Sequence, residues 1–136
     1  MSKTPQIRGW CPGAWRPMMS GDGLVVRIRP LQNRLSRDQV YALADLSIRY
    51  GHGIIDLTSR ANLQIRGVSP DRHDELLSHL ASAGLLAPNA ETEARRNILC
   101  SPFWQADDRT DRLHQRVLAR ITEMPELPAK MGIAVD

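Results

Sequence analysis

The sequence predicts an α+β domain of the ferredoxin-like split βαβ type, in which two helices cover one face of an antiparallel sheet. Three observations lead to this prediction: the order strand, helix, strand, strand, helix over residues 24–84, the alternation of apolar and polar side chains within the strands, and helix-start signals before both helices. The chain has 136 residues, of which 42% are hydrophobic and 24% charged. Its size and composition suit one compact soluble domain, with room for the start of a second.

The first strand is predicted over residues 24–29, just ahead of Pro30. Successive side chains of a strand point to opposite faces. One face is apolar and carries Leu24, Val26 and Ile28. The other face carries Val25, Arg27 and Arg29. The strand therefore offers an apolar side to a core and a largely basic side to a different environment.

The first helix is predicted to begin after Ser36 and to end at Gly51. Ser36 and Gln39 have the spacing of a capping box, and glycine is favoured just past the last turn of a helix. The residues expected on its buried stripe recur at helical spacing: Val40, Leu43, Ala44 and Ser47.

A β-hairpin is predicted next, with strands over residues 54–57 and 62–66 and a four-residue connection between them. In the second of these strands, Leu63 and Ile65 share the apolar face. The opposite face carries Asn62, Gln64 and Arg66. A second helix follows up to Gly84, capped by Ser69 and opened by a proline.

The rest of the chain gives weaker signals. We expect a linker at residues 88–93, a fourth strand at 97–100, a helix at 111–124, and a final strand at 131–135 that has no partner. These assignments divide the chain into three parts: an N-terminal arm (1–23), a half-domain (24–102), and a linker with the start of a second, truncated domain (103–136).

The most informative pattern is the polar face that the first and third strands share. If the two helices take the apolar face, then the polar side chains, with Arg60 on the connection beside them, form a grid of hydrogen-bond donors on the other side. Such a grid suits a large flat anion with several carboxylates. A sheet with one face toward water is the alternative reading. The five grid positions, which include no lysine and no acid, favour a ligand: Arg27, Arg29, Asn62, Gln64 and Arg66.

Charge is distributed unevenly along the chain. Residues 1–70 hold ten Lys and Arg against four Asp and Glu, whereas residues 71–136 hold eight against eleven. Sixteen of the eighteen basic residues are arginine, which binds planar oxyanions with paired hydrogen bonds. An anionic partner is therefore one reading of the first half, and a solvated basic surface is the other. The adjacent residues Arg95 and Arg96 are, without other information, interpreted as a solvated pair.

Several classes of site are disfavoured. The two cysteines, Cys11 and Cys100, are too few and too far apart for a disulfide framework or a four-thiolate metal site. The four histidines have no metal-ligand spacing, and we predict no metal ligands in the chain. No apolar run is long enough to span a membrane, and the N-terminus has no signal peptide pattern, so a cytoplasmic location is expected.

Two segments resemble a known enzyme family. The run from Asp56 to Gly67, DLTSRANLQIRG, closely resembles the signature hairpin of sulfite and nitrite reductases, and the run RNILCS from Arg96 resembles the segment that follows it. Arg27 and Arg29-Pro30 resemble the first strand of that family. The N-terminal motif GWCPG, with PMMSGDGL after it, is similar to the precorrin-3B synthase branch.

The resemblance implies a role for the polar face. In this family such residues surround a carboxylated tetrapyrrole, so Arg60, Asn62, Gln64 and Arg66 would line the macrocycle, with Asn97 next to them in the following segment. Arg96 and one of Arg27 or Arg29 would reach toward the reacting centre, and the sequence leaves open which of these two does so.

The branch implies an oxidoreductase that hydroxylates precorrin-3A with oxygen and closes a lactone, using a [4Fe–4S] cluster and further iron. Such a cluster needs four thiolates, so two cysteines cannot ligate it. A missing C-terminal half or a partner subunit would then supply the cluster. By this reading the chain alone is incomplete and inactive, and residues 103–136 begin a truncated iron–sulfur and tetrapyrrole domain.

Other functions stay open. A fragment of a sirohaem-dependent sulfite or nitrite reductase would bind its tetrapyrrole at the same face. A non-catalytic partner subunit is a further alternative. A nucleic-acid-binding module would need aromatic side chains on the central strands, and the polar face has none, so no nucleic-acid partner is expected. No membrane partner is expected either, because no apolar run is long enough to span one.

Overall fold

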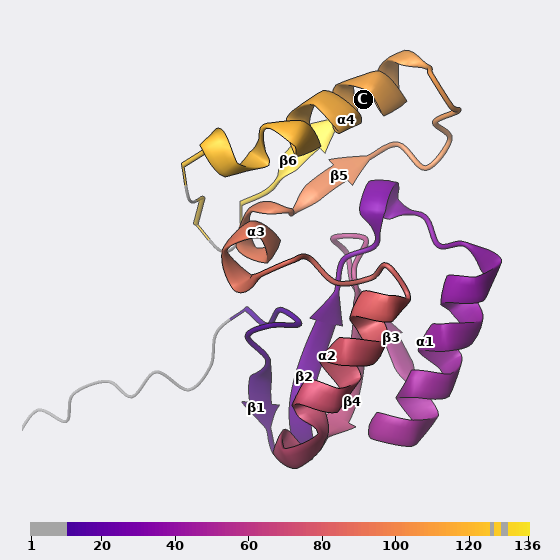
Figure 1. Cartoon of the computed structure of the whole chain (residues 1–136), viewed down its shortest axis with the longest axis vertical. Coiled ribbons are helices and arrows are strands. Elements are labelled where there is room, and N and C mark those ends of the chain that lie inside the picture. Colours follow the sequence, from indigo (N-terminus) through magenta and orange to yellow (C-terminus); the bar gives the residue numbers. More distant parts are fainter. Residues whose placement is uncertain (1–10, 126, 129–130) are drawn as a thin grey trace, which may run out of the picture.

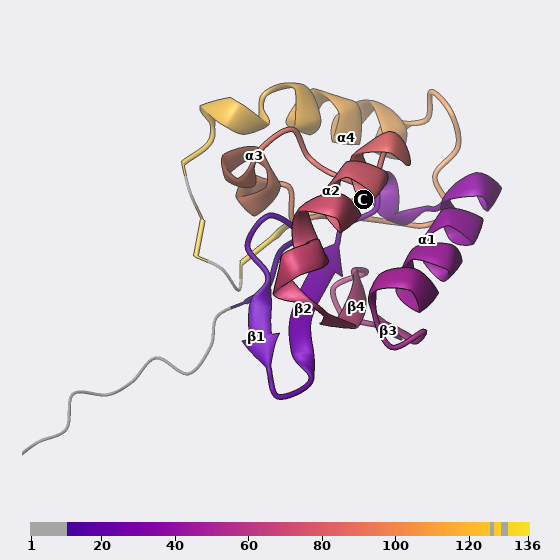
Figure 2. The ribbon, with the colours of Figure 1, turned by 60° about the horizontal axis from the view of Figure 1, so that its bottom comes forward.

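The computed structural model describes residues 11–125, 127–128 and 131–136 (Figure 1). Its main sheet has the strand order β1-β2-β4-β3, and each neighbouring pair is antiparallel. The strands are β1 (Met18–Ser20), β2 (Gly23–Ile28), β3 (Ile55–Leu57) and β4 (Leu63–Val68). Helices α1 (Arg37–Tyr50) and α2 (His73–Ser82) lie together on one side of this sheet (Figures 1 and 2). The predicted α+β class and the helix-covered antiparallel sheet are confirmed.

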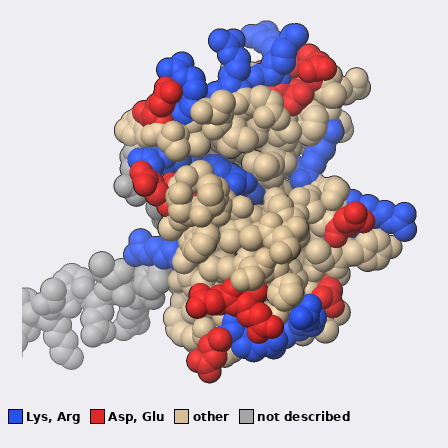
Figure 3. Space-filling model, in the orientation of Figure 1, with Lys and Arg blue, Asp and Glu red and all other residues tan. Residues whose placement is uncertain are grey.

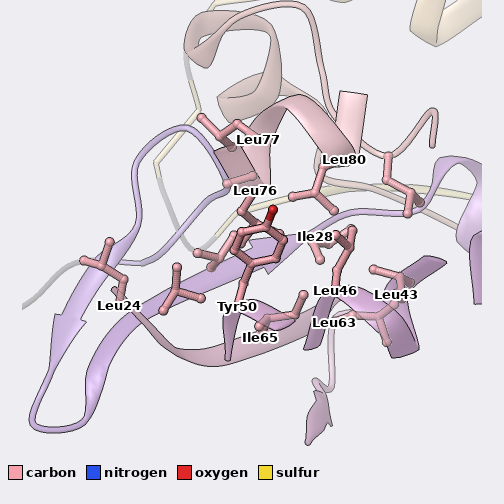
Figure 4. Packing of buried hydrophobic residues seen from close by; sticks show 14 residues of the cluster. Leu24, Ile28, Leu43, Leu46, Tyr50, Leu63, Ile65, Leu76, Leu77 and Leu80 are labelled. Atoms are coloured by element: carbon pink, nitrogen blue, oxygen red, sulfur yellow. The ribbon is translucent and has the colours of Figure 1, made fainter. Parts of the chain in front are cut away.

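The core lies between the sheet and these two helices. The apolar faces of β2 and β4 meet the buried sides of α1 and α2, as Figure 4 shows. The sheet contributes Leu24, Val26, Ile28, Leu63, Ile65 and Val68, and the helices contribute Leu43, Leu46, Tyr50, Leu76, Leu77 and Leu80. Because Val26 and Ile28 of β2 point into this core, Arg27 and the Gln64 opposite it point to the other side of the sheet, on which Val25 is buried as well.

Helix α1 begins as predicted but turns a different face inward. The Ser36 hydroxyl accepts a hydrogen bond from the Gln39 amide at 3.2 Å, and the Gln39 side chain accepts one from the Ser36 amide at 3.0 Å, which is a complete capping box. The buried residues are Leu43, Leu46, Ser47 and Tyr50. Val40, in the first turns of the helix, is 50% exposed, so the predicted stripe was wrong at this position.

The hairpin is confirmed, with Asp56 opposite Gln64 and Leu57 opposite Leu63. The amide of Thr58 donates to the carbonyl of Asn62 at 2.9 Å and closes the loop. Helix α2 is preceded by a 3-10 turn (Pro70–Arg72) rather than by a side-chain cap from Ser69.

Four assignments of the remaining segments were wrong, the last of which concerns the terminal strand. Strand β1 comes from the stretch read as an extended arm, and it forms an edge of the main sheet beside β2. A short helix, α3 (Ala90–Arg95), occupies much of the expected linker, because the Asn89 side chain accepts a hydrogen bond from the Thr92 amide and caps it. The strand expected to be fourth in the main sheet is instead part of a second one.

The second sheet is small and parallel. Strand β5 (Ile98–Cys100) pairs with β6 (Ile133–Val135), so the terminal strand has a partner after all. Helix α4 (Arg109–Ala119) and a 3-10 turn (Ile121–Glu123) cover it, and the apolar side chains of these elements form a second core cluster. This unit lies at one end of the main sheet, with α3 between them in the view of Figure 1. Among the described residues, no helix is both long and apolar enough to cross a membrane.

Candidate functional site

A row of polar side chains crosses three strands of the main sheet. In the register of the main sheet, Arg27 of β2 faces Gln64 of β4, and Gln64 in turn faces Asp56 of β3. The same antiparallel register, continued one pleat further, brings Asn62 toward Arg29 just past the end of β2. Donors from distant parts of the sequence therefore meet on the side of the sheet opposite α1 and α2.

Buried donors without partners distinguish this face from an ordinary solvated one. Asn62 is 4% exposed and Gln64 is 8% exposed, although both lie on the polar side of β4. Within the described residues, the Nε of Arg27, the Nε of Arg29 and the Nδ2 of Asn62 are buried and have no hydrogen-bond partner. A buried donor that is left unpaired is unfavourable, so three such groups on one face distinguish it from a face whose donors are hydrated.

Four guanidinium groups, three of this region and one at the end of α3, are near enough for neighbours to affect one another's pKa. We call Arg60, Arg27, Arg29 and Arg96 the arginine cluster. Burial lowers the pKa of Arg27, nearby Cys11 opposes this, and Arg60 lowers it further. Burial likewise lowers the pKa of Arg29, with further lowering from Arg27 and Arg96 and an opposing effect of Glu93. Like charges held this close in a partly buried place favour the binding of an anion.

Glu93 of α3 is the acid nearest to the inner end of the cluster. The Nη1 of Arg29 donates to the Glu93 backbone carbonyl at 2.5 Å. Burial lowers the pKa of Arg96, and the Glu93 carboxylate raises it. The single carboxylate of Glu93 is therefore near two guanidinium groups, those of Arg29 and Arg96, so this part of the cluster keeps an excess of positive charge.

The loop of the hairpin places Arg60 beside β2. Thr58 Oγ1 accepts hydrogen bonds from the Arg60 amide at 3.4 Å and from the Asn62 amide at 3.2 Å. Ala61 adopts a left-handed backbone conformation with φ 56°. The chain turns tightly here, which brings the Arg60 charge within electrostatic reach of Arg27.

Arg66 and Asn97 both have hydrogen-bond partners within the protein. The Nε of Arg66 forms an ion pair with Asp56 Oδ2 at 2.7 Å, and its Nη2 lies 3.5 Å from Gln64 Oε1. No acidic residue was expected on the polar face. Alternation of side chains within the strand over residues 54–57 could have predicted that Asp56 lies on this face. Asn97 Nδ2 donates to the Met131 carbonyl at 3.2 Å, and its own carbonyl accepts from the Ile133 amide, so this residue anchors β6.

The two cysteines lie in different parts of the molecule. Cys11 lines a hollow of about 460 Å³ together with Arg29 and Arg95. Cys100 is buried in β5, and burial raises the pKa of its thiol. In the described part of the chain, no group of three or more His, Cys, Asp or Glu residues is placed to hold a metal ion.

A second basic surface follows α4, where four exposed arginines recur at helical spacing: Arg109, Arg112, Arg116 and Arg120. Figure 3 shows basic side chains gathered at this end of the molecule. This row differs from the arginine cluster because its side chains are in water, and Arg120 also pairs with Glu123 at 2.8 Å. Exposed arginines of this kind need no ligand.

Comparison with known proteins points to one family. Residues 16–83 match the family described as the nitrite/sulfite reductase ferredoxin-like half domain. A precorrin-3B synthase from Sinorhizobium is 34% identical over 131 residues, which cover 95% of this chain and 28% of that protein. A ferredoxin–nitrite reductase from Synechococcus elongatus is 32% identical over 139 aligned residues, which cover 93% of this chain and 27% of that protein.

A solved structure supports the fold. The Mycobacterium tuberculosis NirA protein superposes with a TM-score of 0.60 at 24% identity, over 76% of this chain and 20% of that one. The chain thus spans little more than a quarter of the length of the curated relatives it matches, and those relatives are oxidoreductases.

Proposed function

The chain belongs to the nitrite/sulfite reductase ferredoxin-like half-domain family, and from this premise we propose that its arginine cluster binds a carboxylated tetrapyrrole. The more specific proposal is that it is the N-terminal, substrate-binding part of a precorrin-3B synthase, which acts on precorrin-3A in cobalamin biosynthesis. The alignment with the Sinorhizobium precorrin-3B synthase, at 34% identity over 95% of the chain, supports this assignment.

One observation carries the proposal: buried, unpaired donors adjoin like charges on a single face. The Nε groups of Arg27 and Arg29 and the Nδ2 of Asn62 lack partners in the part of the chain that the structure describes. A macrocycle rimmed with carboxylates would neutralise the cluster, and it would supply acceptors to these donors once the groups that cover them move aside. Arginine–carboxylate bonds are strong where water is partly excluded, and they hold planar groups in a defined orientation.

The residues of the face take different roles in this proposal. Arg60, Asn62 and Gln64 line the macrocycle, with Arg66 at the outer edge, where Asp56 already offsets its charge. Of the two arginines of the first strand, Arg27 is the better candidate to reach toward the reacting centre. Its guanidinium lies in the row of Gln64 and beside Arg60, whereas Arg29 is partly occupied by the Glu93 carbonyl. These groups position the ligand rather than supply the chemistry.

The residues present do not fit an iron–sulfur cluster. A [4Fe–4S] cluster takes four cysteine thiolates, and this chain has two, one in the segment before β1 and one in β5. We therefore assign no cluster ligand to these 136 residues, and propose that the rest of a longer enzyme or a partner subunit supplies the redox centre.

A sulfite or nitrite reductase is the second candidate. The Synechococcus nitrite reductase aligns with 93% of the chain at 32% identity, and a sirohaem would occupy the same face. The two candidates differ in whether the macrocycle carries iron. Competition of precorrin-3A and of sirohaem against the same bound porphyrin would rank them, and tighter binding of sirohaem would favour the reductase.

Uroporphyrin, a porphyrin with carboxylates around its rim, is the practical probe. We expect the full chain to bind it more tightly than a porphyrin whose rim carries cationic groups, as followed by the shift of its absorption band. Arg60→Ala should weaken this binding more than Arg66→Ala, because Asp56 already pairs with Arg66. Equal affinity of the wild type for the two porphyrins would exclude the proposed site.

A further inference from the structure

Glu93 is the buried acid that holds the segment before β1 against the sheet. It is 7% exposed, although it belongs to a short surface helix. Its Oε1 accepts a hydrogen bond from the Ala14 amide at 2.8 Å, and its Oε2 accepts one from the Trp15 amide at 3.0 Å. We call residues 11–16 the strap. One carboxylate thus satisfies two consecutive backbone donors of a segment that lies 78 and 79 residues away in the sequence.

A side chain at Gly13 would displace this carboxylate. A Cβ there would lie 2.8 Å from Glu93 Oε2 and 3.3 Å from its Cδ. Glycine therefore leaves the room that the carboxylate occupies. This is a physical reason for the glycine of the Trp-Cys-Pro-Gly run in the sequence.

The strap in turn borders the arginine cluster. The Gly13 carbonyl accepts a hydrogen bond from the Arg27 amide at 3.2 Å, so the strap runs beside β2. Cys11, at the other end of the same short segment, lies within electrostatic reach of Arg27 and Arg29. Glu93 reaches the cluster directly as well, because its carbonyl accepts from Arg29 Nη1 at 2.5 Å.

We propose that Glu93 is a positioning residue for the anion site: its carboxylate fixes the strap, and through the strap and Arg29 it fixes the border of the arginine cluster. This inference rests on the proposed function, since it concerns the affinity of that same face. It assigns Glu93 no contact with the ligand.

Whether removal of the Glu93 carboxylate weakens or strengthens anion binding distinguishes a positioning role from a purely electrostatic one. A carboxylate beside Arg29 and Arg96 lowers the positive potential there, so its removal alone would strengthen the binding of an anion. If Glu93 instead holds the site in shape, then its removal weakens binding even though the net charge becomes more favourable. The strap also has anchors that do not involve Glu93: Trp15 Nε1 donates to the Ala87 carbonyl at 2.9 Å, and His73 Nε2 lies 2.8 Å from the Ala14 carbonyl. The fold can therefore survive the change.

Two variants disturb the contact from opposite sides. Glu93→Gln leaves one acceptor oxygen for two amides, and Gly13→Ala crowds the carboxylate without any change of charge. We expect each to weaken uroporphyrin binding by the full chain about tenfold, and to speed hydrogen exchange at the Ala14 and Trp15 amides. Glu91→Gln is the matched control, because Glu91 is an exposed acid on the same helix whose removal leaves the strap contacts intact.

The outcomes are distinct. Wild-type or tighter binding by Glu93→Gln would overturn the inference, and so would a loss of thermal stability in both variants with unchanged affinity, because Glu93 would then be structural only. A wild-type chain that fails to bind uroporphyrin would overturn the proposed function and this inference with it. If the wild type binds, and the arginine variants lose binding while Glu93→Gln does not, then only the role of Glu93 falls.

Discussion

Replacing Arg27 with methionine is expected to stabilise the unliganded chain and to weaken its binding of uroporphyrin. Methionine keeps an apolar stem of similar length but removes the guanidinium. The Nε of Arg27 is buried without a partner among the described residues, and the charge is close to those of Arg60 and Arg29. The change therefore removes both an unsatisfied donor and like-charge repulsion from the folded state.

The magnitude follows from these two terms. An unsatisfied buried donor costs about 1–3 kcal/mol, and the low end applies because the Arg27 side chain is only half-buried. We expect the free energy of unfolding to rise by about 1 kcal/mol, with a rise in Tm of roughly 3 °C. A hydrogen bond to a charged group contributes about 1.5–3 kcal/mol, so affinity for uroporphyrin should fall on the order of 10- to 100-fold.

Urea unfolding followed by circular dichroism gives the first quantity, and an absorption titration gives the second. Arg112→Met is the control, since Arg112 is an exposed member of the row on α4 and should change unfolding by no more than about 0.5 kcal/mol. The reasoning is refuted if Arg27→Met is less stable than the wild type and binds uroporphyrin equally well.

Three further predictions concern the core, the second unit and the metal content. Leu76→Ala, at a position with no exposed surface, should cost about 2–5 kcal/mol in urea unfolding; a cost below about 1 kcal/mol would contradict the core described here. Burial lowers the pKa of His114 in the folded chain below its ordinary 6.5, so the unfolded chain binds the proton more readily. The stability that this residue contributes is therefore complete above about pH 6.5 and is lost as the pH falls below that value. His114→Gln should reduce the difference between urea midpoints at roughly pH 7.5 and 5.5, and an unchanged difference would exclude His114 as its source. The purified chain, incubated with iron and sulfide, should lack the broad visible absorption of an iron–sulfur cluster; one cluster per chain would show that the cysteine argument is wrong.

Local signals in the sequence were enough to predict the central strands of the main sheet and the two helices that cover it. The capping box of Ser36 and Gln39, and the alternation in β2 and β4, each depend on neighbours along the chain. The helix face was less well predicted: Val40 was expected to be buried and is half exposed, whereas Leu46 and Tyr50 are buried, because the sheet beneath decides which part of the helix is covered. Periodicity alone does not contain that information.

Strand partners could not be predicted in the same way. Residues 98–100 form a strand as expected, but their partner is β6, more than thirty residues further on, rather than the main sheet. Short strands such as β1 and β5 carry too few side chains to specify a partner, so tertiary packing decides. The Asn89 cap of α3 was readable in principle, yet the proline before it made the segment look like a linker.

The candidate site shows the same division. Alternation placed Arg27 and Gln64 on one face, and the register of the sheet brings them opposite each other. The contact of Glu93 with the strap was out of reach, because its partners are two backbone amides, which have no sequence signature. Arg66 was expected among the donors of that face, and the structure adds an acid that the prediction left out, Asp56, which pairs with it.

The central claim is that the unpaired donors of the arginine cluster are the ones an anionic macrocycle satisfies. Arginine side-chain Nε–Hε signals in nitrogen-15 NMR report on those groups individually. On titration of the full chain with uroporphyrin, we predict that the signals of Arg27 and Arg29 move first and furthest, while those of the α4 row stay in place. The claim would be contradicted if only the signals of Arg109, Arg112 and Arg116 moved and those of Arg27 and Arg29 stayed unchanged.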